Sequence, residues 1–135
     1  MLLVLIGVVS CSSVNASAYA NVYDCKPING AEIFDEPSSI DVSSMASMVV
    51  MIDEDKRIAV TVVDNDQKPI PTIYGFSKVD RDNGSYTFTA HHPNLTVGLM
   101  IGGLRKEEPY KATQFVIDNR FNGNAVVNYE CQKIR

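Results

Sequence analysis

Turn-forming residues recur roughly every eight to twelve positions beyond residue 20 and separate short runs in which apolar and polar side chains alternate. This spacing is typical of all-β sandwiches and barrels. The clearest hairpin joins residues 73–79 to residues 85–90, and the first strand is expected at 22–26, ended by a turn at Asn29 and Gly30. The sequence therefore predicts an all-β fold, an antiparallel barrel or sandwich of about seven to nine strands.

One segment, 44–56, fits two kinds of secondary structure. Met45, Met48, Val49 and Ile52 have the spacing of one face of a helix. The same segment is rich in β-branched residues and ends only a few positions before the next alternating run, which favours a strand within a hairpin. We expect a strand, with one short helix as the alternative.

The size and charge of the chain limit what it can be. The chain has 135 residues and a formal net charge of −4. Residues 21–135 provide enough apolar side chains for one hydrophobic core and predict a single β domain. The acidic balance argues against nucleic acid as a partner, because binding phosphates needs a basic surface. No stretch after residue 20 has the ~18 consecutive apolar residues that a transmembrane helix needs.

Residues 1–20 have the features of a signal peptide. They carry no charge, and an apolar run is followed by a small-x-small pattern at 18–20, typical of a signal peptidase site. Residues 8–11 also resemble a bacterial lipobox, in which the signal is 1–10 and the lipid is attached to Cys11. We therefore expect an exported protein, either periplasmic or secreted after cleavage at residue 20, or lipid-anchored at Cys11.

Either form of export leaves two cysteines in the folded part, Cys25 and Cys131. An even number of cysteines in an exported domain predicts a disulfide, and two cysteines allow one pairing. Because the two Cα atoms of a disulfide lie close together, the N- and C-terminal strands are expected to be neighbours.

Few residues point to catalysis or to a cofactor. His91 and His92 are the two histidines, and adjacent side chains in an extended segment point to opposite faces, which argues against a shared metal. Asp80, Asp82 and Gly84 match a calcium loop only in part, because the glycine comes one residue early and no glutamate ends the loop. The chain has no glycine-rich phosphate loop and no nucleophile elbow. We expect no cofactor and no enzyme, with a small hydrolase that uses His91 or His92 as an alternative.

Two short motifs resemble those of the small periplasmic lysozyme inhibitors of bacteria. A Tyr-x-Cys sequence at 23–25 and the late Cys131 are similar to the ends of the c-type-directed members. The turn at 83–86 is similar to their Ser-Gly-x-Tyr loop, with Asn83 where the motif has serine. The resemblance implies an exported or lipid-anchored β protein whose 80–86 turn enters the cleft of a lysozyme.

These observations predict a small exported, non-enzymatic binding domain of the bacterial envelope whose partner is a protein or an envelope component. The lysozyme inhibitor is the alternative that the resemblance adds. Tyr86 is expected to face the core, because it alternates in phase with Phe88 and Ala90; at a recognition tip it would face solvent instead. The candidate binding residues are Asn83, Gly84, Ser85 and Tyr86.

Overall fold

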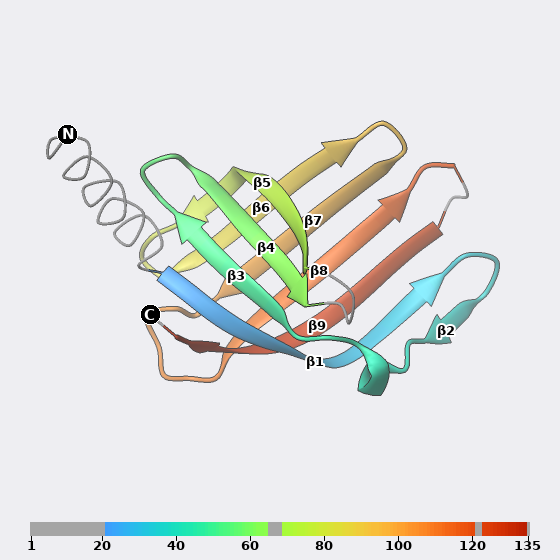
Figure 1. Cartoon of the computed structure of the whole chain (residues 1–135), viewed down its shortest axis with the longest axis horizontal. Helices are drawn as coiled ribbons and strands as arrows, with labels where there is room; N and C mark the ends of the chain where they lie inside the picture. Colours follow the sequence, from blue (N-terminus) through green and yellow to red (C-terminus); the bar gives the residue numbers. More distant parts are fainter. Residues whose placement is uncertain (1–20, 65–68, 121–122, 135) are drawn as a thin grey trace, which may run out of the picture.

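The structure, a computed structural model, describes residues 21–64, 69–120 and 123–134 and is entirely built from β-strands and one turn of 3-10 helix (Figure 1). The expected signal peptide, 1–20, and Cys11 lie outside the described residues. The elements are β1 (Asn21–Ile33), β2 (Pro37–Ser39), η1 (Val42–Ser44), β3 (Met48–Asp53), β4 (Ile58–Asp64), β5 (Pro69–Asp80), β6 (Ser85–His92), β7 (Leu95–Gly102), β8 (Tyr110–Asp118) and β9 (Gly123–Lys133).

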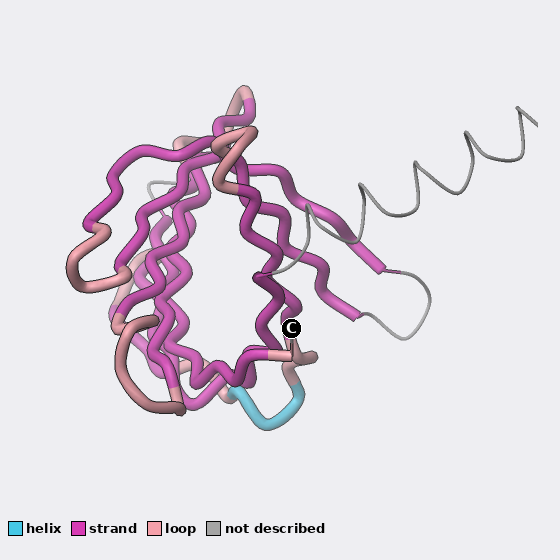
Figure 2. The backbone as a smooth tube through the Cα atoms, turned by 90° about the vertical axis from the view of Figure 1, so that its left-hand side faces the viewer, coloured by secondary structure: helices cyan, strands magenta, loops and turns pink. Residues whose placement is uncertain are grey.

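The strands form a closed antiparallel barrel (Figure 2). From β3 to β9 each strand pairs with the strand that follows it along the chain. β1 completes the ring, because its first half pairs with β3 and its other edge pairs with β9. β2 pairs with the second half of β1 and lies outside the ring of the other eight strands. The predicted all-β class is confirmed, and the fold is a barrel rather than a sandwich.

β1 is longer than the sequence predicts. The expected turn at Asn29 and Gly30 is wrong, because both residues lie inside the strand and pair with β9. The register shifts between Pro27 and Asn29, where a bulge bends the strand. Gly30 allows β1 and β9 to lie close together, because a Cβ on it would lie 2.9 Å from the Val126 carbonyl oxygen. Long-range pairing with β9 thus overrides the local turn preference.

The ambiguous segment at 44–56 forms the strand that its β-branched residues favour. β3 and β4 make a hairpin, so the predicted strand is confirmed. The single turn of η1 precedes it, and the Asp41 carboxylate caps this turn by accepting hydrogen bonds from the Ser43 backbone nitrogen and hydroxyl. Val42, the first residue of η1, and Met45, which follows it, pack against the core.

Inward-facing side chains fill the barrel. A polar network crosses this interior, because the Tyr74 hydroxyl accepts hydrogen bonds from Thr61 (3.4 Å) and Gln114 (3.2 Å), and Tyr129 donates to Gln114 (3.1 Å). Within the described residues, every buried side-chain nitrogen or oxygen has a partner. The buried apolar residues are Val22, Tyr23, Cys25, Met48, Val50, Ile52, Ala59, Tyr74, Phe88, Ala90, Val97, Leu99, Ile101, Ala112, Val127, Tyr129 and Cys131.

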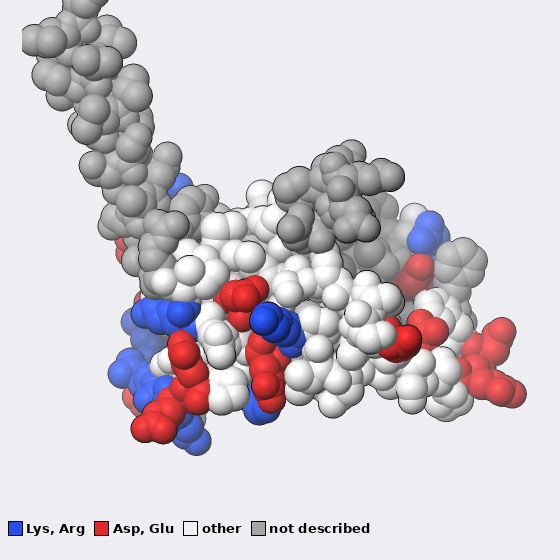
Figure 3. Space-filling view, turned by 60° about the horizontal axis from the view of Figure 1, so that its bottom comes forward, with Lys and Arg blue, Asp and Glu red and all other residues white. Residues whose placement is uncertain are grey.

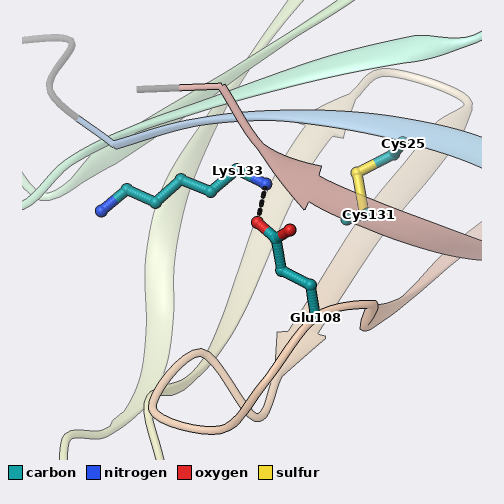
Figure 4. Close-up of a disulfide and its surroundings, with 4 residues drawn as sticks. All are labelled: Cys25, Glu108, Cys131 and Lys133. Atoms are coloured by element: carbon teal, nitrogen blue, oxygen red, sulfur yellow. Dashed lines mark hydrogen bonds between the residues drawn. A yellow bond between two sulfur atoms is a disulfide. The ribbon is translucent and has the colours of Figure 1, made fainter.

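The predicted disulfide is confirmed. Cys25 on β1 and Cys131 on β9 lie opposite each other, bonded, with their Cα atoms 4.0 Å apart (Figure 4). The bond joins the N- and C-terminal strands at the closure of the barrel. Stable disulfides form in oxidising compartments, so the bond indicates such a location for the protein. The described residues include no helix of the length and apolarity needed to cross a bilayer.

Candidate functional site

Three connections and the two ends of the described chain meet at one end of the barrel. The connections are the β3–β4 turn, the β5–β6 turn and the β7–β8 loop. β1 begins and β9 ends at the same end, because these strands are antiparallel and Tyr23 pairs with Lys133. Basic and acidic side chains are interspersed here, whereas acidic side chains gather at the opposite tip (Figure 3).

A recess of about 190 Å³ opens at this end of the barrel, and we call it the basin. Its lining combines buried core residues, such as Tyr23 and Ile52, with exposed charged side chains. Residues far apart in the sequence therefore share one site. The lining residues are Asn21, Tyr23, Ile52, Glu54, Arg81, Gly84, Tyr86, Leu104, Arg105 and Lys133.

Tyr86 belongs both to the core and to the basin. Its ring stacks on Phe88, with centroids 5.8 Å apart, and meets the edge of Phe76 at 5.7 Å. This is the inward orientation that its alternation with Phe88 predicts. Its hydroxyl reaches the basin and donates a hydrogen bond to the Glu54 carboxylate. Burial, reinforced by the Glu54 bond and charge, raises the pKa of Tyr86 to about 12, whereas the Arg81 charge acts in the opposite direction.

The β5–β6 turn forms one wall of the basin. Asp80 holds the turn by accepting hydrogen bonds from the Asn83 side chain (2.8 Å) and backbone nitrogen (3.3 Å), and these bonds lower the pKa of Asp80. Gly84 has a φ of +65°, but Asn83 does not share this left-handed conformation, so a two-residue Asn-Gly turn is not formed. Instead, residues 81–84 form the connection, and Gly84 closes it.

Most of the predicted binding turn is packed rather than free. Gly84 is buried, and its carbonyl accepts a hydrogen bond from the Leu104 backbone nitrogen at 3.1 Å. Ser85 is half-buried beside Gly102. The exposed part of the turn is residues 81–83. Of the four predicted binding residues, Gly84 and Tyr86 therefore line the basin, whereas Asn83 and Ser85 do not.

Three cations line the basin beside Glu54. Arg105 donates from Nε to the backbone carbonyl of Arg81, which holds the β7–β8 loop against the β5–β6 turn. The backbone nitrogen of Lys133 donates to Glu108 at 2.8 Å, while the Lys133 side chain extends away from the disulfide (Figure 4). Among the described residues, Arg81, Arg105 and Lys133 form no ion pair. Among the residues that line the recess, three cations therefore face a single carboxylate in the charge count.

The histidines lie away from the basin. His91 and His92 end β6 at the opposite end of the barrel, and both are exposed. The described part of the chain contains no group of three or more His, Cys, Asp or Glu side chains placed to hold a metal ion. Asp80, at the start of the partial calcium loop, uses both carboxylate oxygens for Asn83.

The residues that sequence reasoning missed are the charged ones. Glu54, Arg81, Arg105 and Lys133 come from three connections and a strand end, and no local spacing links them. Glu54 lies in the connection between β3 and β4, and its position against Tyr86 depends on barrel closure.

Compared with protein families, curated proteins and solved structures, the chain shows no match. The resemblance to lysozyme inhibitors therefore remains a prediction from two short motifs.

Proposed function

We propose that the protein is a small exported binding domain of the bacterial envelope, without enzymatic activity, that recognises a protein or an envelope component through the basin. The domain is periplasmic or secreted if the signal peptide ends at residue 20, and membrane-attached if Cys11 carries a lipid. The disulfide supports export, because it needs an oxidising compartment.

The observation that carries the proposal is the convergence of charged and hydroxyl groups on one recess. Tyr86, Glu54, Arg81, Arg105 and Lys133 reach it from separate elements. Barrel mouths are common ligand sites, because the rigid strands hold side chains on loops that tolerate change. Here the filled interior leaves recognition to the mouth rather than to a central cavity.

A lysozyme inhibitor that works through the 80–86 turn is a second candidate. One observation favours it: residues 81–83 are exposed on the rim, and Gly84 docks the turn on the β7–β8 loop, so that the tip is held in place. A rigid tip loses little entropy when it enters a cleft. For a hydrolase no such observation exists, because His91 and His92 are exposed at the end of β6 and do not line the basin.

The test is capture of a partner by the exported protein. The protein, immobilised and crosslinked in envelope extract, is compared with Arg81→Gln/Lys133→Gln, which removes two basin cations and keeps both backbone hydrogen bonds. The matched control is Lys26→Gln/Lys78→Gln, which makes the same change in net charge outside the basin. We expect the basin variant to lose a captured partner that the control retains, with equal melting temperatures. Equal capture by both variants contradicts the proposal.

Purified lysozymes separate the two candidates. An inhibitor reduces lysozyme activity in a turbidity assay, and a variant with residues 82 and 83 replaced by alanine, which keeps the basin cation Arg81, does not. A partner other than lysozyme, captured through the basin, supports the general binding role and excludes the inhibitor.

A further inference from the structure

The basin has the charge of an anion site. Arg81, Arg105 and Lys133 line the basin together with one carboxylate, Glu54, and none of these cations has an ion-pair partner among the described residues. The charge of Arg81 is close enough to Tyr86 to oppose the rise in the pKa of its hydroxyl. All three side chains are exposed around the recess, where their charges add to a positive potential that attracts an anion.

The backbone beneath these cations is fixed by hydrogen bonds. Leu104 donates to Gly84 at 3.1 Å, and Arg105 donates from Nε to Arg81, so the two arginine-bearing connections are tied together. The bond from Arg105 uses Nε and leaves the terminal nitrogens of this guanidinium for another acceptor. Lys133 is anchored through its backbone nitrogen on Glu108 (Figure 4).

We infer that the basin binds an oxyanion, a carboxylate or a phosphate, between Arg81, Arg105 and Lys133. This inference rests on the proposed binding function and names the chemistry that the site recognises. Arginine and lysine form charge-assisted hydrogen bonds with both groups. Glu54, fixed by the Tyr86 hydroxyl, accepts a hydrogen bond from a neighbouring hydroxyl or ammonium group of the same ligand.

The size of the basin limits what enters it. Its volume is about 190 Å³, which is below the ~300–1,000 Å³ typical of pockets for drug-sized ligands. This space holds one anionic group with its adjoining atoms, such as an acidic side chain or a phosphate with part of a sugar. The ligand group is therefore small, even where a larger partner carries it.

The exported protein is titrated with inorganic phosphate and, separately, with acetate. Binding is monitored by the NMR chemical shifts of the backbone amides and the arginine Nε–H groups. Sodium chloride at equal ionic strength is the reference. We expect saturable shifts at Arg81, Arg105 and Lys133. The apparent affinity should fall by about tenfold in Arg81→Gln and in Lys133→Gln, as expected for loss of one charge-assisted hydrogen bond, and stay unchanged in Lys26→Gln/Lys78→Gln.

The two probes identify the source of the oxyanion. Tighter binding of phosphate assigns a phosphate ligand, and equal or tighter binding of acetate assigns a carboxylate. Shifts that do not saturate, or that match those of chloride, overturn the inference. If the inference is overturned in this way but a partner is still captured through the basin, the proposed function stands and the anion chemistry fails. If oxyanions bind but capture ignores the basin, the inference stands and the proposed function fails.

Discussion

At the scale of single residues, two glycines near the basin have left-handed backbones in different surroundings. Gly84 has a φ of +65°, and a Cβ on it would lie 3.0 Å from the Arg105 backbone nitrogen. Gly103 has a φ of +72°, and a Cβ there would have no neighbour within 4 Å. The first glycine is needed for both conformation and space, and the second for conformation alone.

We expect Gly84→Ala to destabilise the protein more than Gly103→Ala. The strain of a left-handed alanine costs about 1–2 kcal/mol at either position. Crowding against Arg105 adds about 1–3 kcal/mol at residue 84. Urea denaturation of both variants measures the difference. Equal losses would mean that the β7–β8 loop does not rest on the β5–β6 turn.

Tyr86 makes stability sensitive to alkaline pH. Burial and Glu54 raise the pKa of its hydroxyl from the ordinary value of 10.0 to about 12 in the folded protein. Because the folded state holds this proton more tightly, the contribution is complete below pH 10 and is lost as the pH rises through about 12. We expect Tyr86→Phe to lose stability less steeply over this range than the wild type does, with Glu54→Gln intermediate. The urea midpoints of the three proteins are measured between pH 8 and pH 12. Parallel curves of midpoint against pH would contradict this expectation.

At the scale of elements, one aromatic ring covers a glycine between two neighbouring strands. Gly98 on β7 pairs with Phe115 on β8, and a Cβ on Gly98 would lie 1.9 Å from the ring carbon Cζ of Phe115. Leu99 faces the core, so its neighbour Gly98 lies on the outer face of the barrel. Gly98 is nevertheless buried. The ring therefore shields the outer face of the strand pair at this position.

This contact predicts a change of sign in a double-mutant cycle. Gly98→Ala alone forces the ring away and should cost about 1–3 kcal/mol. In the Phe115→Ala background the obstacle is gone, and alanine should stabilise the strand by about 0.5–1 kcal/mol relative to glycine. Thermal or urea unfolding of the four proteins completes the cycle. The same cost in both backgrounds would show that Phe115 does not cover Gly98.

At the scale of the whole molecule, the disulfide holds together strands from the two ends of the sequence. Cys25 and Cys131 are separated by 106 positions and are completely buried. We expect Cys131→Ser to cost about 2–5 kcal/mol, as the loss of a native disulfide from a small exported domain usually does. Reduction of the wild type should lower the urea midpoint by a similar amount. A variant as stable as the oxidised wild type would contradict this expectation.

Local features of the fold could be predicted, and features that depend on closure could not. The hairpin from β5 to β6 follows from alternation and from the turn residues between its strands, which lie close in sequence. The length of β1 depends on β9, a partner at the other end of the chain, so the local composition of Asn29 and Gly30 indicates a turn although both residues lie within the strand. The basin was missed for the same reason, since Glu54 and Lys133 meet only after the ring has closed.

The pairing of β1 with both β3 and β9, which closes the ring, has a consequence for folding. The hairpins from β3 to β9 need only neighbouring segments, but the ring cannot close until β9, far along the chain, returns to β1. Such high contact order slows folding, because the entropy of a long loop is lost before the contact forms. The sulfur atoms of Cys25 and Cys131 come together only at that last seam. In the native fold, the bond therefore lies at the seam that closes the barrel, and the residues of the basin come together only when this seam is formed.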